Sequence, residues 1–252
     1  MQREVDGLVA KLDTLQLFFG DDYKLNDKIT IHHPTIGEIV DAGEENYFSA
    51  VFGLTAIPSD MISVLWDVGI DWEECKDLTM FYLMVMQMPP ENYHLFFRDL
   101  DFSKFRLLVR DDGIYQMVDS ENDIVIDEYT QKLISDFICR LHGIKKTPRF
   151  AGNSYTKKIL ISEDRKDRER ASKKEHQSSM LPLISSMVNS ADFKYDLSQV
   201  RNMKIFPFMD SVARIQLKDA VGHVSNGYYS GNIDTSKFDT KKLDWMRDLY
   251  KA

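Results

Sequence analysis

The sequence predicts a mainly α-helical protein with a minor antiparallel β-hairpin. Apolar residues recur at helical spacing along most of the chain, strand-like segments flank a hairpin turn near 105–126, and residues 162–179 contain no apolar residue larger than Ala171. We therefore expect two helical parts separated by a charged segment. Their expected limits are 1–155 for an acidic, mostly helical domain, 156–179 for a charged helix or linker, and 180–252 for a small basic helical lobe.

The first 55 residues are expected to hold two helices and a short strand. A helix that ends at Gly20 carries Leu8, Leu12, Leu15 and Phe19 on its apolar face. Residues 28–32 alternate like a half-buried strand. Thr35 and Glu38 have the spacing of a capping box. They begin one long helix whose apolar side holds Ile36, Ile39, Val40, Tyr47, Val51 and Leu54.

Three helical segments are expected next. Ser59 is predicted to cap a helix that ends at Gly69 and turns Met61, Ile62, Leu65 and Trp66 inward. Residues 78–88 are nearly all apolar and predict a buried helix that is too short to span a bilayer. Pro89 and Pro90 end it, and residues 91–100 predict one more helical piece.

The β segment and the most periodic helix follow. Residues 105–109 and 114–118 flank a good hairpin turn at 111–113, and 124–126 is a candidate third strand. Asp127 is then predicted to cap a helix that ends at Gly143. Its predicted inward residues are Tyr129, Leu133, Ile134, Phe137, Ile138 and Leu141.

In the C-terminal part, Ser162 followed by acids predicts the start of a solvated charged helix, with a disordered linker as the alternative. Further helices are expected over 180–188 and from Pro207, the second with Phe208, Val212 and Ile215 and with Val221 as a candidate further member. A last helix carries Leu243, Trp245, Met246 and Leu249 and is capped by Asp239 or Thr240. Residues 222–231 are rich in Gly, Ser and Tyr and predict a loop.

The charge is divided unevenly along the chain. Residues 1–155 carry 27 acids and 14 Lys or Arg, whereas residues 156–252 carry 13 acids and 18 Lys or Arg. Apolar residues at 43% and aromatics at 12% are values of a globular protein. No apolar run is long enough to span a membrane, and the N-terminus lacks the apolar core of a secretory signal. Cys75 and Cys139 are expected to be buried free thiols in an intracellular protein.

No catalytic, cofactor-binding or metal-binding residue is predicted, and we do not expect an enzyme. His32 and His33 form the one histidine pair, but no further ligand at recurring short spacing supports a metal site. Residues 119–123 resemble the opening of a calcium loop without its required Gly and Glu. Asp60 and Glu74 imitate the acids of a metal nuclease, but local capping is the favoured role. Nucleotide-binding glycine loops are absent.

Nucleic acid is not an expected partner, although the C-terminal part is basic. Within 162–175, six basic residues alternate with five acidic ones, so few counterions would be released from a phosphate backbone. A second small basic patch consists of Arg201, Lys204, Arg214 and Lys218. A solvated or partner-facing surface is the favoured interpretation of both.

Several short strings together resemble a known group of proteins. They are Leu17-Phe18-Phe19-Gly20, residues 26–31, Pro34-Thr35-Ile36-Gly37, Ile57-Pro58-Ser59-Asp60, Ala151-Gly152-Asn153 and residues 183–190. The group comes from tailed bacteriophages and prophages of Gram-positive bacteria, and its members are described as tail assembly chaperones or structural proteins. The likeness runs from about residue 15 to residue 250. Its motifs are caps, turns and core positions, so no functional residue is carried over.

The resemblance implies a chaperone that binds a tape-measure or tube protein in the host cytoplasm during tail building. The alternative is a stoichiometric virion component, such as a connector, tail or baseplate subunit. A nucleic-acid-binding protein is a distant third hypothesis, and a homo-oligomer is left open. Met80, Met84, Met86 and Met88 could form an adaptable apolar binding surface, although a core position is favoured for methionines at this spacing.

Overall fold

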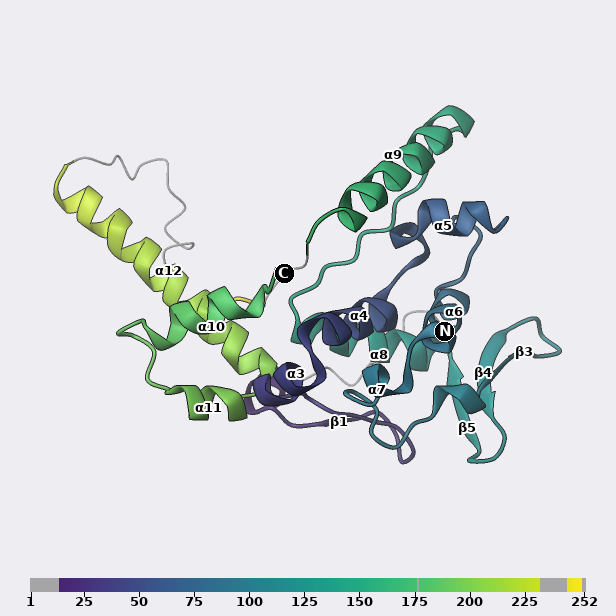
Figure 1. Cartoon of the computed structure of the whole chain (residues 1–252), viewed down its shortest axis with the longest axis horizontal. Helices are drawn as coiled ribbons and strands as arrows, with labels where there is room; N and C mark the ends of the chain where they lie inside the picture. Colours follow the sequence, from purple (N-terminus) through teal and green to yellow (C-terminus); the bar gives the residue numbers. More distant parts are fainter. Residues whose placement is uncertain (1–13, 176, 232–243, 251–252) are drawn as a thin grey trace.

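The computed structural model describes residues 14–175, 177–231 and 244–250. These residues form eleven α-helices, two 3-10 helices and two small antiparallel sheets, which confirms the mainly helical class. The molecule is elongated: the three-stranded sheet lies at one end, and the long helix α12 projects from the other (Figure 1). Among the described residues, no helix combines the length and the apolar character that a membrane-spanning segment needs.

The first described elements are a short helix and a two-stranded sheet. Helix α2 (Thr14–Phe19) ends at Gly20, whose φ of 78° is favourable for glycine, and β1 (Tyr23–Lys24) pairs with β2 (Thr30–Ile31). The predicted apolar face of α2 is wrong. Leu15 and Phe19 are 60% and 73% exposed, and Leu17 is the buried residue. Leu8 and Leu12 lie outside the described residues.

The long helix predicted after Thr35 is two helices. The capping box is confirmed: the Thr35 side chain accepts the Glu38 N–H, and the Glu38 side chain accepts the Thr35 N–H. Helix α3 (Ile36–Ala42) then stops at Gly43, and α4 (Glu44–Thr55) begins in a new direction. The φ of 87° at Gly43 permits this break. Val40, predicted to be buried, is consequently 52% exposed.

In the next segments the buried helix predicted over 78–88 is confirmed, whereas the helices before and after it are shorter than predicted. These segments are the 3-10 helix η1 (Pro58–Asp60), α5 (Ile62–Asp67), α6 (Asp77–Gln87), α7 (Pro90–Tyr93) and the 3-10 helix η2 (Phe102–Lys104). Ser59 does not cap α5, because it lies inside η1, where the Asp60 carboxylate accepts the Ile57 N–H at 3.0 Å. Trp66 is 43% exposed, which contradicts its predicted inward position. In α6, Met80 is buried and Met86 is 39% exposed.

The β segment and the helix after it match the prediction closely. Strands β3 (Arg106–Val109), β4 (Tyr115–Asp119) and β5 (Ile124–Asp127) form one antiparallel sheet in that order, which confirms the third strand. The Asp127 carboxylate accepts the Thr130 N–H at 2.8 Å and caps α8 (Glu128–Leu141). Tyr129, at 37% exposed, is the one predicted inward residue of α8 that faces solvent.

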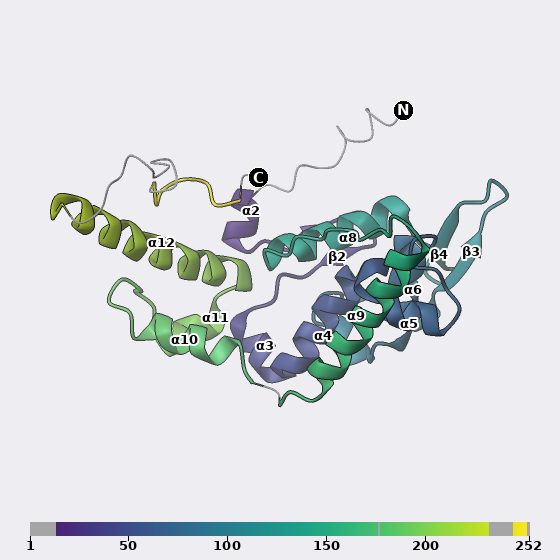
Figure 2. The ribbon, with the colours of Figure 1, turned by 90° about the horizontal axis from the view of Figure 1, so that it is seen from above.

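The charged stretch is helical, but its start was misplaced. Helix α9 (Ser154–Ser172) begins eight residues before Ser162, and Asn153 caps it by accepting the Thr156 N–H at 2.9 Å. Residues 162–175 are mostly exposed, as expected of a solvated helix, but one side of the helix is covered. Asp164 is only 8% exposed because α9 packs against α5, as Figure 2 shows.

The described residues from 177 onward form three helices. They are α10 (Met180–Val188), as predicted, α11 (Leu197–Asn202), which was not predicted, and α12 (Ile205–Tyr229). The loop predicted over 222–231 is wrong up to Tyr229, because glycine weakens a helix by only about 1 kcal/mol and does not prevent it. Within 244–250 the chain forms turns instead of the predicted last helix. Leu243 and its two candidate caps lie outside the described residues.

The two halves of the chain share the main hydrophobic core. Buried residues from α3 and α4 belong to the same cluster as Val200 of α11 and Phe208 and Val212 of α12. A second, smaller cluster lies beneath α5 and α9 and includes Ile62, Trp72 and Ile161. The arrangement therefore places the start of α12 directly against the N-terminal elements, while its far end extends away from them (Figures 1 and 2).

Candidate functional site

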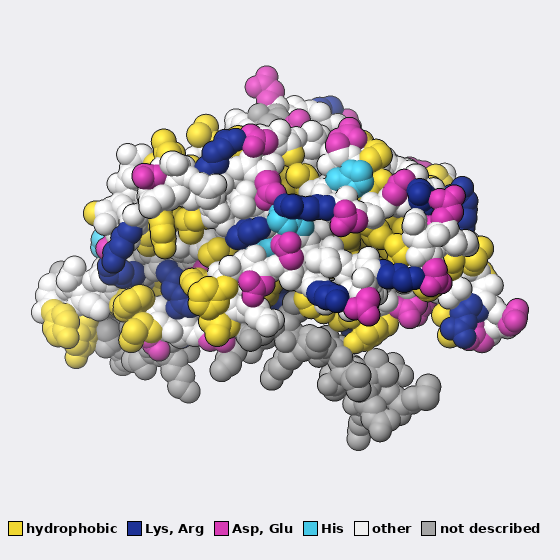
Figure 3. Space-filling model, turned by 90° about the horizontal axis from the view of Figure 1, so that it is seen from below, with side chains coloured by type: hydrophobic (Ala, Val, Ile, Leu, Met, Phe, Trp, Pro, Cys, Tyr) yellow, Lys and Arg dark blue, Asp and Glu magenta, His cyan; other side chains and the backbone are white. Residues whose placement is uncertain are grey.

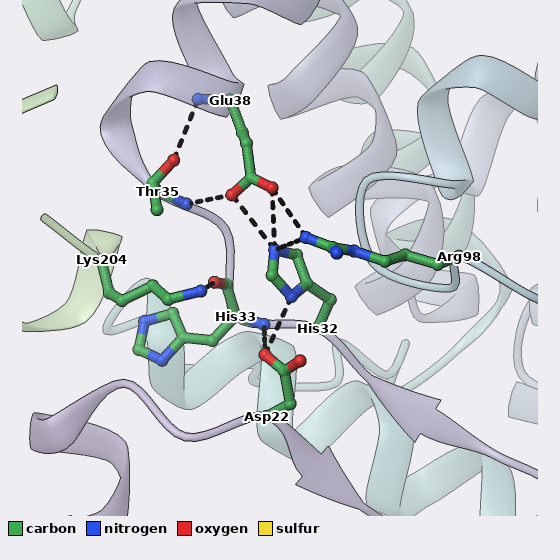
Figure 4. Close-up of polar contacts among 7 residues, drawn as sticks. All are labelled: Asp22, His32, His33, Thr35, Glu38, Arg98 and Lys204. Atoms are coloured by element: carbon green, nitrogen blue, oxygen red, sulfur yellow. Dashed lines mark hydrogen bonds and ion pairs between the residues drawn. The ribbon is translucent and has the colours of Figure 1, made fainter. Parts of the chain in front are cut away.

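The densest polar cluster that we find lies where α12 meets the N-terminal half. We call it the junction; its members are Asp22, His32, His33, Thr35, Glu38, Arg98 and Lys204 (Figure 4). They come from the turn before β1, the segment after β2, the start of α3, the segment after α7 and the residue that precedes α12. Residues far apart in sequence therefore meet at one place.

His32 lies between two carboxylates. Its Nδ1 is 2.9 Å from Asp22 Oδ1, and its Nε2 is 3.0 Å from Glu38 Oε1. The Arg98 guanidinium donates to Glu38 Oε1 at 2.8 Å and also lies 2.7 Å from His32 Nε2. That nitrogen can donate to Glu38 or accept from Arg98, depending on the ring's tautomer. Both ring nitrogens thus have partners within the protein.

Hydrogen bonds keep both carboxylates of the junction ionised. Burial alone would raise the pKa of Glu38, but hydrogen bonds from the Thr35 N–H and from His32 outweigh it and lower that pKa to about 2. Burial would also raise the pKa of Asp22. Hydrogen bonds from the His33 N–H and from His32 outweigh this effect and lower the pKa. The carboxylates therefore serve as acceptors for neighbouring groups at neutral pH.

His33 is a neutral, buried acceptor. Its side chain is fully buried, and its Nε2 accepts the Phe206 N–H at 3.2 Å. Its backbone carbonyl accepts from Lys204 Nζ at 2.5 Å. Burial, followed by the nearby Lys204 charge, lowers the pKa of His33 to about 3. A protonated ring could not accept from Phe206, so the neutral form holds the start of α12 in place.

Backbone contacts extend the junction. The Ile36 N–H donates to the Met203 carbonyl at 2.8 Å, and the Ile205 N–H donates to the Pro34 carbonyl at 3.0 Å. Gly37 permits this approach, because a Cβ there would lie 2.8 Å from the Arg201 carbonyl oxygen. The segment from Pro34 to Gly37, which shares in the resemblance to tail assembly proteins, therefore forms part of the surface against which α11 and α12 pack.

The other groups considered from sequence lie apart from the junction and have local partners. Asp119 accepts the backbone N–H groups of Glu121 and Asn122, as expected for a turn. Asp60 pairs with Lys146 at 2.7 Å. Both cysteines are free, and burial raises the pKa of the Cys139 thiol to about 11. Within the described residues, no group of three or more His, Cys, Asp or Glu side chains could hold a metal ion.

The four residues of the predicted basic patch also have partners in the protein. Three of them form ion pairs: Arg201 with Asp41 at 2.5 Å, Lys218 with Asp192 at 2.7 Å, and Arg214 with Asp210 at 3.4 Å. The fourth, Lys204, belongs to the junction and donates to the His33 carbonyl. On the face drawn in Figure 3, basic and acidic side chains lie beside one another. This face therefore carries no continuous basic stripe of the kind that follows a phosphate backbone.

Sequence reasoning found the histidine pair but not its neighbours. Asp22, Arg98 and Lys204 stand at no recognisable spacing from His32 and are brought to it by the fold. The capping box at Thr35 and the glycine two residues later were the available signals. A glycine at the second position of a helix, where propensity disfavours it, indicates close approach of another segment.

Fold and junction together define a mainly helical protein whose C-terminal helices pack against its N-terminal half through a shared hydrophobic core and the polar junction. Residues 172–250 match the family model described as the YomV second domain, which covers under a third of the chain. This is a phage-type family, and the match suggests a phage protein. Searches of curated proteins and of solved structures found no match.

Proposed function

We propose that the chain is a phage morphogenesis protein, a tail assembly chaperone, that acts by protein–protein contact and not by catalysis. One observation carries this proposal: the groups best suited to chemistry bind one another. His32, Asp22, Glu38 and Arg98 are joined into one network, and His33 is used to hold α12. The resemblance to tail assembly proteins and the family match at residues 172–250 support the phage setting.

The surface supports a role in binding. Exposed apolar side chains gather at one place: Leu15 and Phe18 of α2 line the same pocket as Met246, and the three are 60%, 43% and 72% exposed. Such side chains are candidates for burial against another protein. The four residues of the basic patch already bind groups within the protein, so they favour a protein partner over nucleic acid. Assembly in the host cytoplasm is part of the same proposal.

The test is co-expression of the full chain with the tape-measure and tube proteins of its phage. A chaperone should co-purify with one of them and be scarce in purified particles examined by mass spectrometry. A stoichiometric amount in the particles would instead identify a virion component. Failure to bind either tail protein, together with a salt-dependent shift of duplex DNA, would overturn the proposal in favour of nucleic-acid binding.

A further inference from the structure

Among the residues that the structure describes, no strand pairs with the outer edge of β3. The sheet order places β3 at the border, with β4 as its one neighbour, and Figure 1 shows β3 outermost at that end of the molecule. Leu108 and Val109 are 45% and 57% exposed, and Ile114 beyond the turn is 43% exposed. An exposed edge with apolar side chains can accept a further strand.

The hydrogen-bond pattern shows which backbone groups the edge offers. The Arg110 N–H donates to the Ile114 carbonyl at 2.9 Å, so Arg110 faces β4. Because the direction alternates along an antiparallel strand, Leu108 also directs its N–H and C=O toward β4. Leu107 and Val109 direct theirs away from the sheet. The edge therefore presents two donors and two acceptors to an incoming strand.

The side chains of β3 specify what that strand should carry. Arg106, Leu108 and Arg110 alternate on one face, with the apolar residue between two cations. Arg106 donates to the carbonyls of Ser103 and Phe105, and no carboxylate pairs with it among the described residues. Arg110 lies 3.2 Å from Asp112, but both side chains are about half exposed, so this pair is weak.

In two simple registers the same charges disfavour a second copy of the chain as the added strand. Antiparallel pairing of two β3 strands centred on Leu108 would place Arg106 opposite Arg110 of the other copy, and parallel pairing in register would place like residues together. Like charges directly opposite one another destabilise a sheet. Acidic residues on the incoming strand would instead pair with both arginines.

We propose that the β3 edge binds an extended segment of a partner protein, in which two acidic residues four positions apart flank an apolar residue. The segment adds a fourth strand to the sheet through the outward backbone groups of Leu107 and Val109. This inference rests on the proposed function only in taking the partner to be a protein. It uses a surface distant from the junction.

The test uses the full chain and a synthetic peptide with the core Glu-Val-Leu-Val-Glu, titrated to millimolar concentration and followed by amide NMR. We expect shifts centred on residues 106–110 and slower hydrogen exchange at Leu107 and Val109. The peptide with Lys at both Glu positions should bind about tenfold more weakly. Equal binding of the two peptides, or no shift at β3 with the acidic one, would refute the inference.

Two matched variants complete the experiment. Val109→Pro removes an outward N–H without touching the β3–β4 bonds and should weaken peptide binding about tenfold or more. Val125→Pro, whose N–H points outward at the opposite edge on β5 and whose side chain is 43% exposed, should leave binding unchanged. If the unmodified chain forms a dimer and Val109→Pro makes it monomeric, the edge serves self-association and the proposal is overturned. Co-purification with a tail protein tests the function separately, because it can succeed when this peptide fails.

Discussion

Two buried histidines should make the protein progressively less stable as the pH falls below neutral. The pKa of His33 is lowered to about 3, and burial lowers the pKa of His142 to about 4, against 6.5 in a free side chain. His142 Nδ1 donates to the Ile138 carbonyl at 2.7 Å, and its Nε2 accepts from the Tyr47 hydroxyl at 2.6 Å. Both rings are therefore held neutral by the fold.

The sign follows from proton linkage. Because each folded-state pKa lies below the unfolded one, the unfolded chain binds more protons between these values, and acidification favours unfolding. Each histidine should lower the free energy of unfolding by about 2 kcal/mol between pH 7.5 and pH 5, which gives about 4 kcal/mol for the pair. The lowered pKa values of Asp22 and Glu38 act in the same direction, but mainly below this window.

The measurement is urea unfolding at several pH values between 7.5 and 5, followed by circular dichroism. His142→Phe should cost about 1 to 3 kcal/mol at pH 7.5, because the Tyr47 hydroxyl loses its acceptor, but it should halve the loss on acidification. His94→Gln is the control, since the His94 side chain is exposed. A free energy of unfolding that stays constant or rises from pH 7.5 to pH 5 would refute this reasoning. So would a His142→Phe variant whose free energy of unfolding falls as much over this range as that of the unmodified chain.

Three further substitutions test the contacts between segments. Gly37→Ala should destabilise by about 1 to 3 kcal/mol and speed proteolysis of α11, because its Cβ would press on the Arg201 carbonyl; an unchanged melting temperature would contradict this. Glu44→Ala should cost about 1 to 2 kcal/mol and raise hydrogen exchange at the first turn of α10, whose N–H groups the Glu44 carboxylate accepts. Asp164→Ala should cost about 2 kcal/mol and raise exchange in α5, because the Ser63 N–H loses its acceptor; protection equal to the parent would contradict the contact.

Local signals predicted elements well where the deciding interactions are short-range. The capping box at Thr35, the cap at Asp127 and the turn before β4 each depend on residues within four positions of one another, and each was confirmed. Errors arose where local signals competed. Ser162 resembles a helix start, but Asn153 provides an earlier one, and Gly222 resembles a loop residue within a helix that continues past it.

The junction lay beyond sequence reasoning because its members are distant along the chain. The sequence by itself determined the mainly helical class, most helix and strand positions and the absence of familiar catalytic motifs, since periodicity and caps act over a few residues. Only the tertiary structure decided that His32 lies between Asp22 and Glu38, and that His33 accepts from the start of α12. Such contacts depend on how helices pack in three dimensions, and the spacing of residues along the chain does not predict that packing.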